Sequence, residues 1–263
     1  MYKAVEIHNL TVSYHYKPVL WDIDLTLPEG HLIGIIGPNG SGKTTLLKSI
    51  MGLVTPDSGY VKLFDQPLDK VRDRVSYVPQ RESVDWDFPI SVREVIEMGR
   101  FRNQNLWQRL KQEDKDLAIQ ALEKVGLTPF ADRQIAQLSG GQQQRVFIAR
   151  ALAQQADLYL MDEPFAGVDA ASEQAILALL AEMKAIGKTV VIVHHDLQTV
   201  REYFDWIVLL NTSLIACDSV ENALIEENLR RAYGGKLTIL SHVSDMLQTR
   251  DFPVREQKPK LRQ

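Results

Sequence analysis

Residues 31–50 read HLIGIIGPNGSGKTTLLKSI, and this stretch decides the fold. Its first part, residues 31–37, is short, continuously apolar and ends in glycine, which is typical of a strand buried in a parallel sheet. From residue 43 the chain reads as a helix, with Gly52 near its end. The sequence therefore predicts a strand, a glycine-rich loop and a helix in immediate succession.

The loop itself, GPNGSGKT at residues 37–44, matches the pattern G-x-x-x-x-G-K-[ST] between a strand and a helix. Glycine allows the tight bend that points backbone N–H groups inward at phosphate oxygens, and the helix adds its positive end. We therefore predict a P-loop that binds a nucleoside triphosphate. Its expected nucleotide-binding residues are Gly37, Pro38, Asn39, Gly40, Ser41, Gly42, Lys43, Thr44 and Thr45.

Five side chains are assigned to the chemistry of this loop. Lys43 is expected to reach the β- and γ-phosphates, the Thr44 hydroxyl to bind Mg²⁺, and Thr45 to donate to the α-phosphate. Asp162 ends the apolar run LYLMD and is suited to a second magnesium contact. Glu163 follows it and could orient or deprotonate the attacking water, although alone it reads equally well as a solvated charge.

The region before the loop predicts antiparallel structure. Residues 4–14 show broken alternation and indicate a strand or two. Residues 19–27 alternate, which predicts that Val19, Trp21 and Ile23 face the core of a half-exposed strand, with Asp22 and Asp24 on the other side. Further strands are expected in GYVKLFD and VSYVPQ.

Helical patterns fill residues 91–156, where Ser91 is a plausible N-cap. Strands and helices then alternate again: LYLMDEP, a helix over residues 170–187, TVVIVHHD, and a terminal hairpin. The expected fold is α/β, with a parallel core, an antiparallel β lobe and a helical insertion. We assign the core and β lobe to residues 1–90 and 157–240, the helical subdomain to 91–156, and a polar tail to 241–263.

Composition bounds the function. The chain has 263 residues, with 45% hydrophobic and 24% charged residues and a formal net charge of −4. This balance argues against a partner nucleic acid, since such binders usually carry a basic excess. We find no apolar run of the roughly 18–20 residues that span a bilayer and no signal-peptide core, so we expect a cytosolic protein. A single cysteine excludes an internal disulfide framework.

A second glycine-rich motif, LSGGQQQR, occupies residues 138–145 directly before a predicted helix. Ser139 is a good N-cap, and two glycines leave N–H groups accessible at the positive helix end. In isolation this motif reads as a flexible helix start. Its presence in a chain that already has a phosphate cradle needs a further explanation.

Six motifs together give the chain a close resemblance to ABC-type ATPases, to about residue 235. They are GPNGSGKTT, Gln80 in YVPQ, LSGGQ at 138–142, LYLMDEP, Asp169 in AGVD, and His195 in VHHDL. The resemblance implies a P-loop NTPase core with a helical ABC-specific subdomain, and ATP with Mg²⁺ as cofactors. It also implies that Gln80 senses Mg²⁺ and the attacking water, that Asp169 reaches across a dimer, and that His195 contacts the γ-phosphate. His194 is then expected to serve packing.

The resemblance also accounts for the second motif. In this family two such chains pack head to tail, and Ser139, Gly140, Gly141 and Gln142 of one meet the γ-phosphate held by the other. It implies a homodimer, integral membrane permease subunits, an extracytoplasmic metal-binding protein as an indirect partner, and a peripheral position at the cytoplasmic face of the membrane. An aromatic residue that stacks on adenine is expected near the first strands, with Tyr14 as our choice and Tyr16 as its rival.

The segment after Gln80, RESVDWDFPISVREV, is the candidate docking surface for a permease. Trp86 and Phe88 lie among acidic residues and proline, so we predict that they are exposed and line this surface, although a local cap over the helical lobe is equally compatible. VHHDL, VPQRESVDWDFPI and LWDIDL resemble the ATP-binding subunits of manganese, zinc and iron importers, with manganese the preferred cargo. The alternatives are a soluble ABC ATPase acting on nucleic acid or ribosomes, and an ATP-dependent regulatory dimer.

Overall fold

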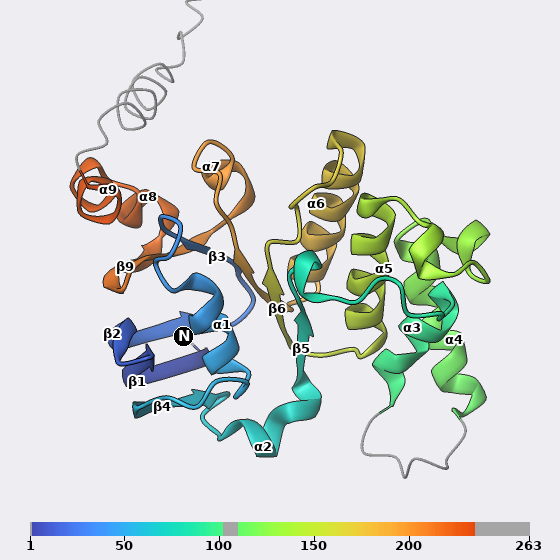
Figure 1. The fold of residues 1–263 in the computed structure, drawn as a ribbon, viewed down its shortest axis with the longest axis horizontal. Helices are drawn as coiled ribbons and strands as arrows, with labels where there is room; N and C mark the ends of the chain where they lie inside the picture. The colour runs from blue at the N-terminus through green and yellow to red at the C-terminus, as the bar shows by residue number, and fades with distance from the viewer. Residues whose placement is uncertain (1, 102–109, 235–263) are drawn as a thin grey trace, which may run out of the picture.

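The computed structural model of the chain describes residues 2–101 and 110–234. It contains two β-sheets and a group of helices beside the larger sheet (Figure 1). The three-stranded sheet has the order β2 (Lys17–Pro28), β1 (Lys3–Tyr14), β4 (Ser58–Leu63). The six-stranded sheet has the order β5 (Val75–Val78), β6 (Leu158–Asp162), β7 (Thr189–Val193), β3 (Leu32–Ile36), β8 (Trp206–Asn211), β9 (Ser213–Ser219).

The helices connect and cover these strands. The described α-helices are α1 (Lys43–Ile50), α2 (Leu68–Val71), α3 (Val92–Glu97), α4 (Gln112–Lys124), α5 (Gly140–Ala153), α6 (Ala170–Ala185), α7 (Val200–Tyr203), α8 (Val220–Ala223) and α9 (Glu226–Tyr233). The described 3₁₀ turns are η1 (Arg72–Arg74), η2 (Arg81–Ser83), η3 (Met98–Arg100), η4 (Thr128–Phe130) and η5 (Ile135–Gln137). None of the helices in this part of the chain is both long and apolar enough to cross a membrane.

The six-stranded sheet is covered on both faces, which explains its apolar strands. Its strands run parallel from β5 to β8, and β9 adds an antiparallel edge. Ile33 and Ile35 of β3 pack with α1 and the three-stranded sheet, whereas Leu32 and Ile36 belong to the core shared with α5 and α6. Every residue of β3, β6 and β7 is buried, so the predicted α/β fold with a buried parallel sheet is confirmed.

The predicted alternation of residues 19–27 is wrong in its first half. Leu10 pairs with Ile23 and Val12 with Leu20, so β2 carries one more residue than β1 between these pairs. This extra residue is a β-bulge with Asp22 at φ 49°, and it reverses which side chains face the core. Leu20 is therefore buried, while Trp21 is 55% exposed. The broken alternation of residues 4–14 corresponds to one strand, β1, which pairs with both β2 and β4.

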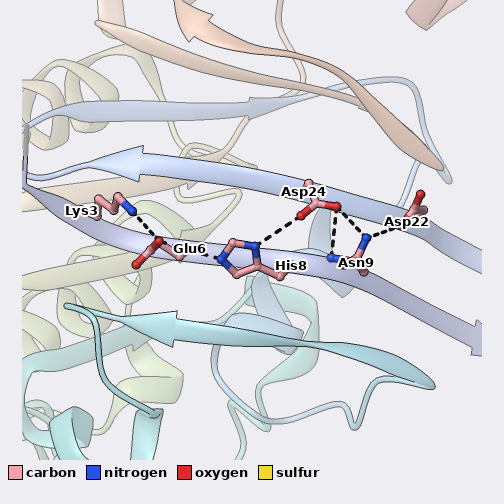
Figure 2. Close-up of polar contacts among 6 residues, drawn as sticks. All are labelled: Lys3, Glu6, His8, Asn9, Asp22 and Asp24. Atoms are coloured by element: carbon pink, nitrogen blue, oxygen red, sulfur yellow. Dashed lines mark hydrogen bonds and ion pairs between the residues drawn. The ribbon is translucent and has the colours of Figure 1, made fainter.

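Polar side chains hold the bulge from the outer face of the β lobe (Figure 2). The Asn9 side chain donates to Asp22 and to Asp24, each at 3.1 Å, and the Asp22 amide donates to Thr11. Asn9 itself has φ 46°, a left-handed conformation that asparagine tolerates better than most residues. A single asparagine and two aspartates thus fix an irregularity that hydrophobic periodicity does not reveal.

Helices α3, α4 and α5 pack together beside the central sheet, and all three lie within residues 91–156. Ser91 caps α3 as expected, accepting from the Glu94 amide while the Glu94 side chain accepts from the Ser91 amide. Helix α6 follows the predicted range, with its apolar stripe buried and Gly187 just beyond its end. The exact division into a core and a helical subdomain stays a prediction, and the predicted tail at residues 241–263 lies outside the described residues.

Trp86 differs from its prediction as an exposed aromatic. Its ring packs edge-on against Phe147 of α5 with the centroids 5.1 Å apart, and its Nε1 donates to the Arg81 carbonyl at 2.8 Å. Its indole N–H thus donates to an acceptor of the same chain, so Trp86 packs over the helical lobe as a local cover and is not a free exposed aromatic. Phe88 is 57% exposed, in agreement with its prediction.

Candidate functional site

The glycine-rich loop joins the carboxyl end of β3 to the start of α1, and two of its glycines are required by close approach. A Cβ on Gly37 would lie 2.0 Å from the Leu210 carbonyl oxygen. Gly42 has φ 98°, and a Cβ there would lie 2.7 Å from the Val19 carbonyl oxygen. Because backbone atoms cannot give way, any side chain at these positions would displace the loop from β8 and β2.

A cavity of about 510 Å³ opens over this loop. It brings together residues that are far apart in the sequence, from the loop, from the end of β5, from the end of β6 and from the end of β7. Its lining residues are Val19, Asn39, Gly40, Ser41, Gly42, Lys43, Thr44, Thr45, Gln80, Glu163 and His195. The cavity lies at the carboxyl ends of parallel strands, where α/β sheets generally bind ligands.

Lys43 is the buried cation of this cavity, with 6% of its surface exposed. Its Nζ donates to the carbonyl oxygens of Gly37 at 2.9 Å and Pro38 at 3.0 Å. Burial lowers the pKa of Lys43, and the nearby carboxylates of Glu163 and Asp162 act in the opposite direction. Because its hydrogen bonds within the described residues go to neutral carbonyl groups, the ammonium group can move to a phosphate without losing a charged hydrogen-bond acceptor.

Asp162 lies at the end of β6, and only one of its two carboxylate oxygens accepts a hydrogen bond from the described residues. Its Oδ1 accepts from the Thr44 hydroxyl at 3.0 Å. Its Oδ2 is buried and has no hydrogen-bond partner among the described residues. Burial raises the pKa of Asp162, and the Thr44 hydrogen bond opposes this shift. A buried hydroxyl–carboxylate pair with a spare oxygen fits a divalent cation such as Mg²⁺.

Glu163 and His195 complete the cavity from two neighbouring strands. Glu163 follows β6 with φ 51°, a conformation that is uncommon for a residue with a side chain. His195 follows β7 and is exposed at the cavity wall. The two side chains therefore face the loop from one edge of the sheet, next to Gln80 from the end of β5.

His194 is buried as expected, and it lies directly before the cavity residue His195. Its ring lies among Phe165, Tyr203 and Phe204, and its Nε2 lies 2.8 Å from the Thr199 hydroxyl. Burial lowers the pKa of His194 to about 4. A neutral imidazole thus anchors the end of β7 directly before His195.

The second glycine-rich motif forms the start of α5. Ser139 caps the helix: its hydroxyl accepts from the Gln142 amide at 3.3 Å, and the Gln142 side chain accepts from the Ser139 amide at 2.9 Å. The N-cap is confirmed, whereas the reciprocal role of Gln142 was missed, although the spacing S-x-x-Q indicates such a capping box. This capping box fixes the first turn of α5, and the backbone N–H groups of that turn lie at the N-terminal end of the helix.

Asp169 lies beside this motif at the start of α6. Its Oδ1 accepts from the Ser172 amide at 2.8 Å, and this hydrogen bond holds the pKa of Asp169 below its ordinary value. A Cβ on Gly141 would lie 2.8 Å from the Ser172 hydroxyl and 3.7 Å from the Asp169 carboxylate. The starts of α5 and α6 therefore form one surface.

The predicted site residues thus fall into two groups, with Tyr14 and its rival Tyr16 outside both. None of the residues from Ser139 to Gln142, nor Asp169, lines the cavity over the glycine-rich loop. Tyr14 and Tyr16 are exposed at the β1–β2 turn and do not line it either. Val19 does line it, which sequence reasoning missed because β2 was read as regular. Arg81 was also missed, although it contacts Gln143 and approaches Gly140.

Comparison with known proteins defines the class. The family model described as ABC transporter matches residues 20–166. Together with the fold and the two glycine-rich motifs, this match shows that the chain belongs to the ABC transporter family and that it is its nucleotide-binding ATPase component.

Individual relatives are close. The manganese transport system ATP-binding protein MntB of Bacillus subtilis (strain 168) is 59% identical over 236 residues, 90% of this chain and 94% of the relative. The zinc transport system ATP-binding protein TroB of Treponema pallidum (strain Nichols) is 56% identical over 235 residues, 89% and 88% of the two chains. A dimeric post-hydrolysis ATP-binding cassette bound to ADP and Pi is similar with a TM-score of 0.71 and 30% identity, covering 82% and 98%.

Proposed function

We propose that two copies of this chain enclose two ATP molecules and that their hydrolysis drives a membrane permease for a divalent metal ion. The observation that carries this proposal is the separation of the two groups of site residues. Lys43, Glu163 and His195 share one cavity, whereas Ser139 and Asp169 lie on a different surface. A second chain packed head to tail would bring the two surfaces together, and a similar cassette is dimeric.

The glycine-rich loop would hold the phosphates in its own chain. Backbone N–H groups from Gly40 to Thr45 and the positive end of α1 would meet the α- and β-phosphates. Lys43 would exchange the carbonyl oxygens of Gly37 and Pro38 for the β- and γ-phosphates. This exchange replaces two neutral acceptors by charged ones, so it favours ATP binding.

Hydrolysis needs an ordered water next to the γ-phosphate. Thr44, Asp162 and Gln80 would hold Mg²⁺, which when bound neutralises charge on the phosphates. Glu163 would accept a proton from the attacking water or orient it, because its left-handed backbone turns it into the cavity. His195 would contact the γ-phosphate from the end of β7.

The partner surface would recognise the same γ-phosphate from the opposite side. The Ser139 hydroxyl and the amides of Gly140, Gly141 and Gln142 lie at the start of α5, where negative charge is favourable. Asp169 would reach across the interface. After hydrolysis the anion that joins the two chains is lost, so the dimer would open.

A permease would contact the segment after Gln80 and exposed apolar residues of the helical region. Phe88, Met98 and Phe101 are 57%, 46% and 55% exposed. A groove of about 320 Å³ is lined in part by Met98, Phe101 and Arg150. Trp86 already packs against Phe147, so we assign the docking role to Phe88 and to this groove. The groove would receive a short cytoplasmic helix of the permease.

The cargo follows from the relatives, which are named for manganese and for zinc transport. We propose import of a divalent metal, with manganese as the first candidate, delivered by an extracytoplasmic metal-binding protein. The chain would then lie at the cytoplasmic face of the membrane, attached through its permease.

The test is the cellular content of a panel of divalent metals in strains that carry the wild type or Lys43→Ala at the native locus. Lys43→Ala should lower ATP turnover by a factor of about 100 or more, because phosphate positioning supplies most of this catalysis. Lys70→Ala, on the exposed face of α2, is the matched control and should change neither turnover nor metal content. A selective fall in one metal supports the proposal and names the cargo, whereas unchanged metals would refute metal transport.

A further inference from the structure

Arg81 connects the cavity to the surface of the same chain formed by the starts of α5 and α6, which we call the partner surface. It directly follows Gln80, which lines the cavity, and it is the first residue of η2. The turn is tight, because the Ser83 amide and hydroxyl both donate to the Gln80 carbonyl, at 3.0 and 2.7 Å. A displacement of Gln80 must therefore carry the backbone of Arg81 with it.

The Arg81 side chain binds the first turn of α5. Its Nη2 and Nε donate to the Gln143 side-chain oxygen at 3.0 and 3.4 Å. Gln143 is 5% exposed, and its amide nitrogen donates to the Ile135 carbonyl at 3.1 Å. This hydrogen bond fixes the orientation of the amide, with its oxygen facing Arg81 as an acceptor. The Arg81 contact is a charge-assisted hydrogen bond to a buried and oriented acceptor.

The guanidinium group also lies against two glycines of the partner surface. A Cβ on Gly140 would lie 3.2 Å from the Arg81 guanidinium carbon, and one on Gly167 would lie 4.0 Å from its Nη1. Gly140 begins α5, and Gly167 precedes Asp169 in the turn before α6. Arg81 thus touches both segments that would meet the partner's nucleotide.

Helix stability does not explain a cation at this position. The start of a helix carries a partial positive charge, so a guanidinium group beside it is unfavourable unless an anion is also near. The backbone of Arg81 is separately fixed to α5, since its carbonyl accepts from Trp86, which packs on Phe147. The side chain is therefore not needed merely to attach this segment to the helix.

We propose that Arg81 is a positioning residue that transmits the state of the ATP cavity to the partner surface, by holding the first turn of α5 in register with Gln80. The inference rests on the proposed function, because it requires that the start of α5 binds nucleotide held by a second chain. Loss of the Arg81–Gln143 contact then weakens ATP-driven dimerisation and leaves ATP binding by a single chain intact.

The experiment measures the two events separately in the full-length chain. ATP affinity of the single chain is measured by titration calorimetry, and the ATP concentration for half-maximal dimerisation by light scattering in a Glu163→Gln background. Arg81→Met, Gln143→Leu and their combination are compared with Arg93→Met. Arg93 is a matched control, because its guanidinium group is engaged in an exposed ion pair with Asp132, which is not a residue of α5.

Arg81→Met should raise the ATP concentration for half-dimerisation at least tenfold and change single-chain affinity less than twofold. Gln143→Leu should do the same, and the double variant should be no worse than the worse single variant by more than twofold, since both variants remove the shared Arg81–Gln143 contact. Arg81→Lys, which keeps the charge but not the planar fork, should be intermediate. Arg93→Met should match the parent in both measurements.

Two results would overturn the inference in distinguishable ways. If the Glu163→Gln parent does not dimerise with ATP, the proposed function fails and the inference falls with it. If the parent dimerises but Arg81→Met dimerises at the same ATP concentration, or the two single effects simply add, the proposed function stands and Arg81 has no positioning role.

Discussion

Glu163 shows how a single residue is held ready for chemistry. It lies in the left-handed region at φ 51°, which costs a residue with a side chain on the order of 1 kcal/mol. The buried strand β6 before it and the hydrogen bond from the Ala166 amide to its carbonyl fix this conformation. The strain persists because the rest of the structure compensates for it, and it turns the carboxylate toward the phosphate loop.

His194 makes the stability of the protein depend on pH. Its pKa falls from 6.5 to about 4 on folding, because burial disfavours the charged ring. Between these values the unfolded chain binds a proton that the folded chain does not, so stability falls as the pH is lowered through this window. The total loss is about 3 kcal/mol, mostly below pH 6.

The measurement is the free energy of unfolding from urea titrations at pH 7.5, 6 and 5, for wild type and His194→Asn. The difference between the two proteins should shift in favour of His194→Asn as the pH falls. A difference that is constant over this range would mean that folding leaves the pKa of His194 unchanged, contrary to its buried position among three aromatic rings.

At the scale of elements, the sequence predicts best where one interaction dominates. Residues 32–36 and 158–162 are buried on both faces, so their continuous apolar runs identify them as strands. The β2 strand is different, because the bulge at Asp22 depends on Asn9, thirteen residues away, and on pairing with β1. Trp86 was misplaced for a similar reason, since its partner Phe147 is distant in the sequence.

The residues of the candidate site also differ in how well the sequence predicts them. The loop residues and Asp162, Glu163 and His195 are recognisable because each ends or follows a strand, and adjacent strands bring them to one edge. Arg81 carries no such signal, since its partner Gln143 lies 62 residues away. Tyr14 was chosen by proximity to the first strands, and its expected contact with adenine stays a prediction.

Two helices with the same cap allow structure and function to be separated. Ser91 and Ser139 each form a capping box, at the starts of α3 and α5. Either serine replaced by alanine should lower the free energy of unfolding by about 1 kcal/mol, from loss of the cap. Only Ser139→Ala should also weaken ATP-driven dimerisation of a Glu163→Gln chain. If Ser91→Ala impairs dimerisation equally, Ser139 acts through helix stability alone.

The segment after Gln80 provides a second test at this scale. Phe88→Asp should abolish co-purification with the permease, because it places a charge on the exposed apolar surface, and it should leave ATP-driven dimerisation intact. Ile186→Asp, at a comparably exposed apolar residue beyond α6, is the control. Retained permease binding by Phe88→Asp would place the docking surface elsewhere.

At the scale of the whole molecule, the arrangement of the two sheets and the helical group places the site residues on two separate surfaces. The six-stranded sheet presents the phosphate loop, Glu163 and His195 at one cavity, with Asp162 hydrogen-bonded to the lining residue Thr44, while α5 and α6 begin on a separate surface. Under the proposed function, ATP itself completes the interface between the two chains.

The most direct test is the molar mass in solution of Glu163→Gln, measured by light scattering with and without ATP and Mg²⁺. Without nucleotide the chain should have its monomer mass of 29.8 kDa. With ATP it should double, because the variant binds but does not hydrolyse the nucleotide that joins the chains. Lys43→Ala in the same background should stay monomeric. A Glu163→Gln chain that binds ATP and remains a monomer at all concentrations would contradict the account.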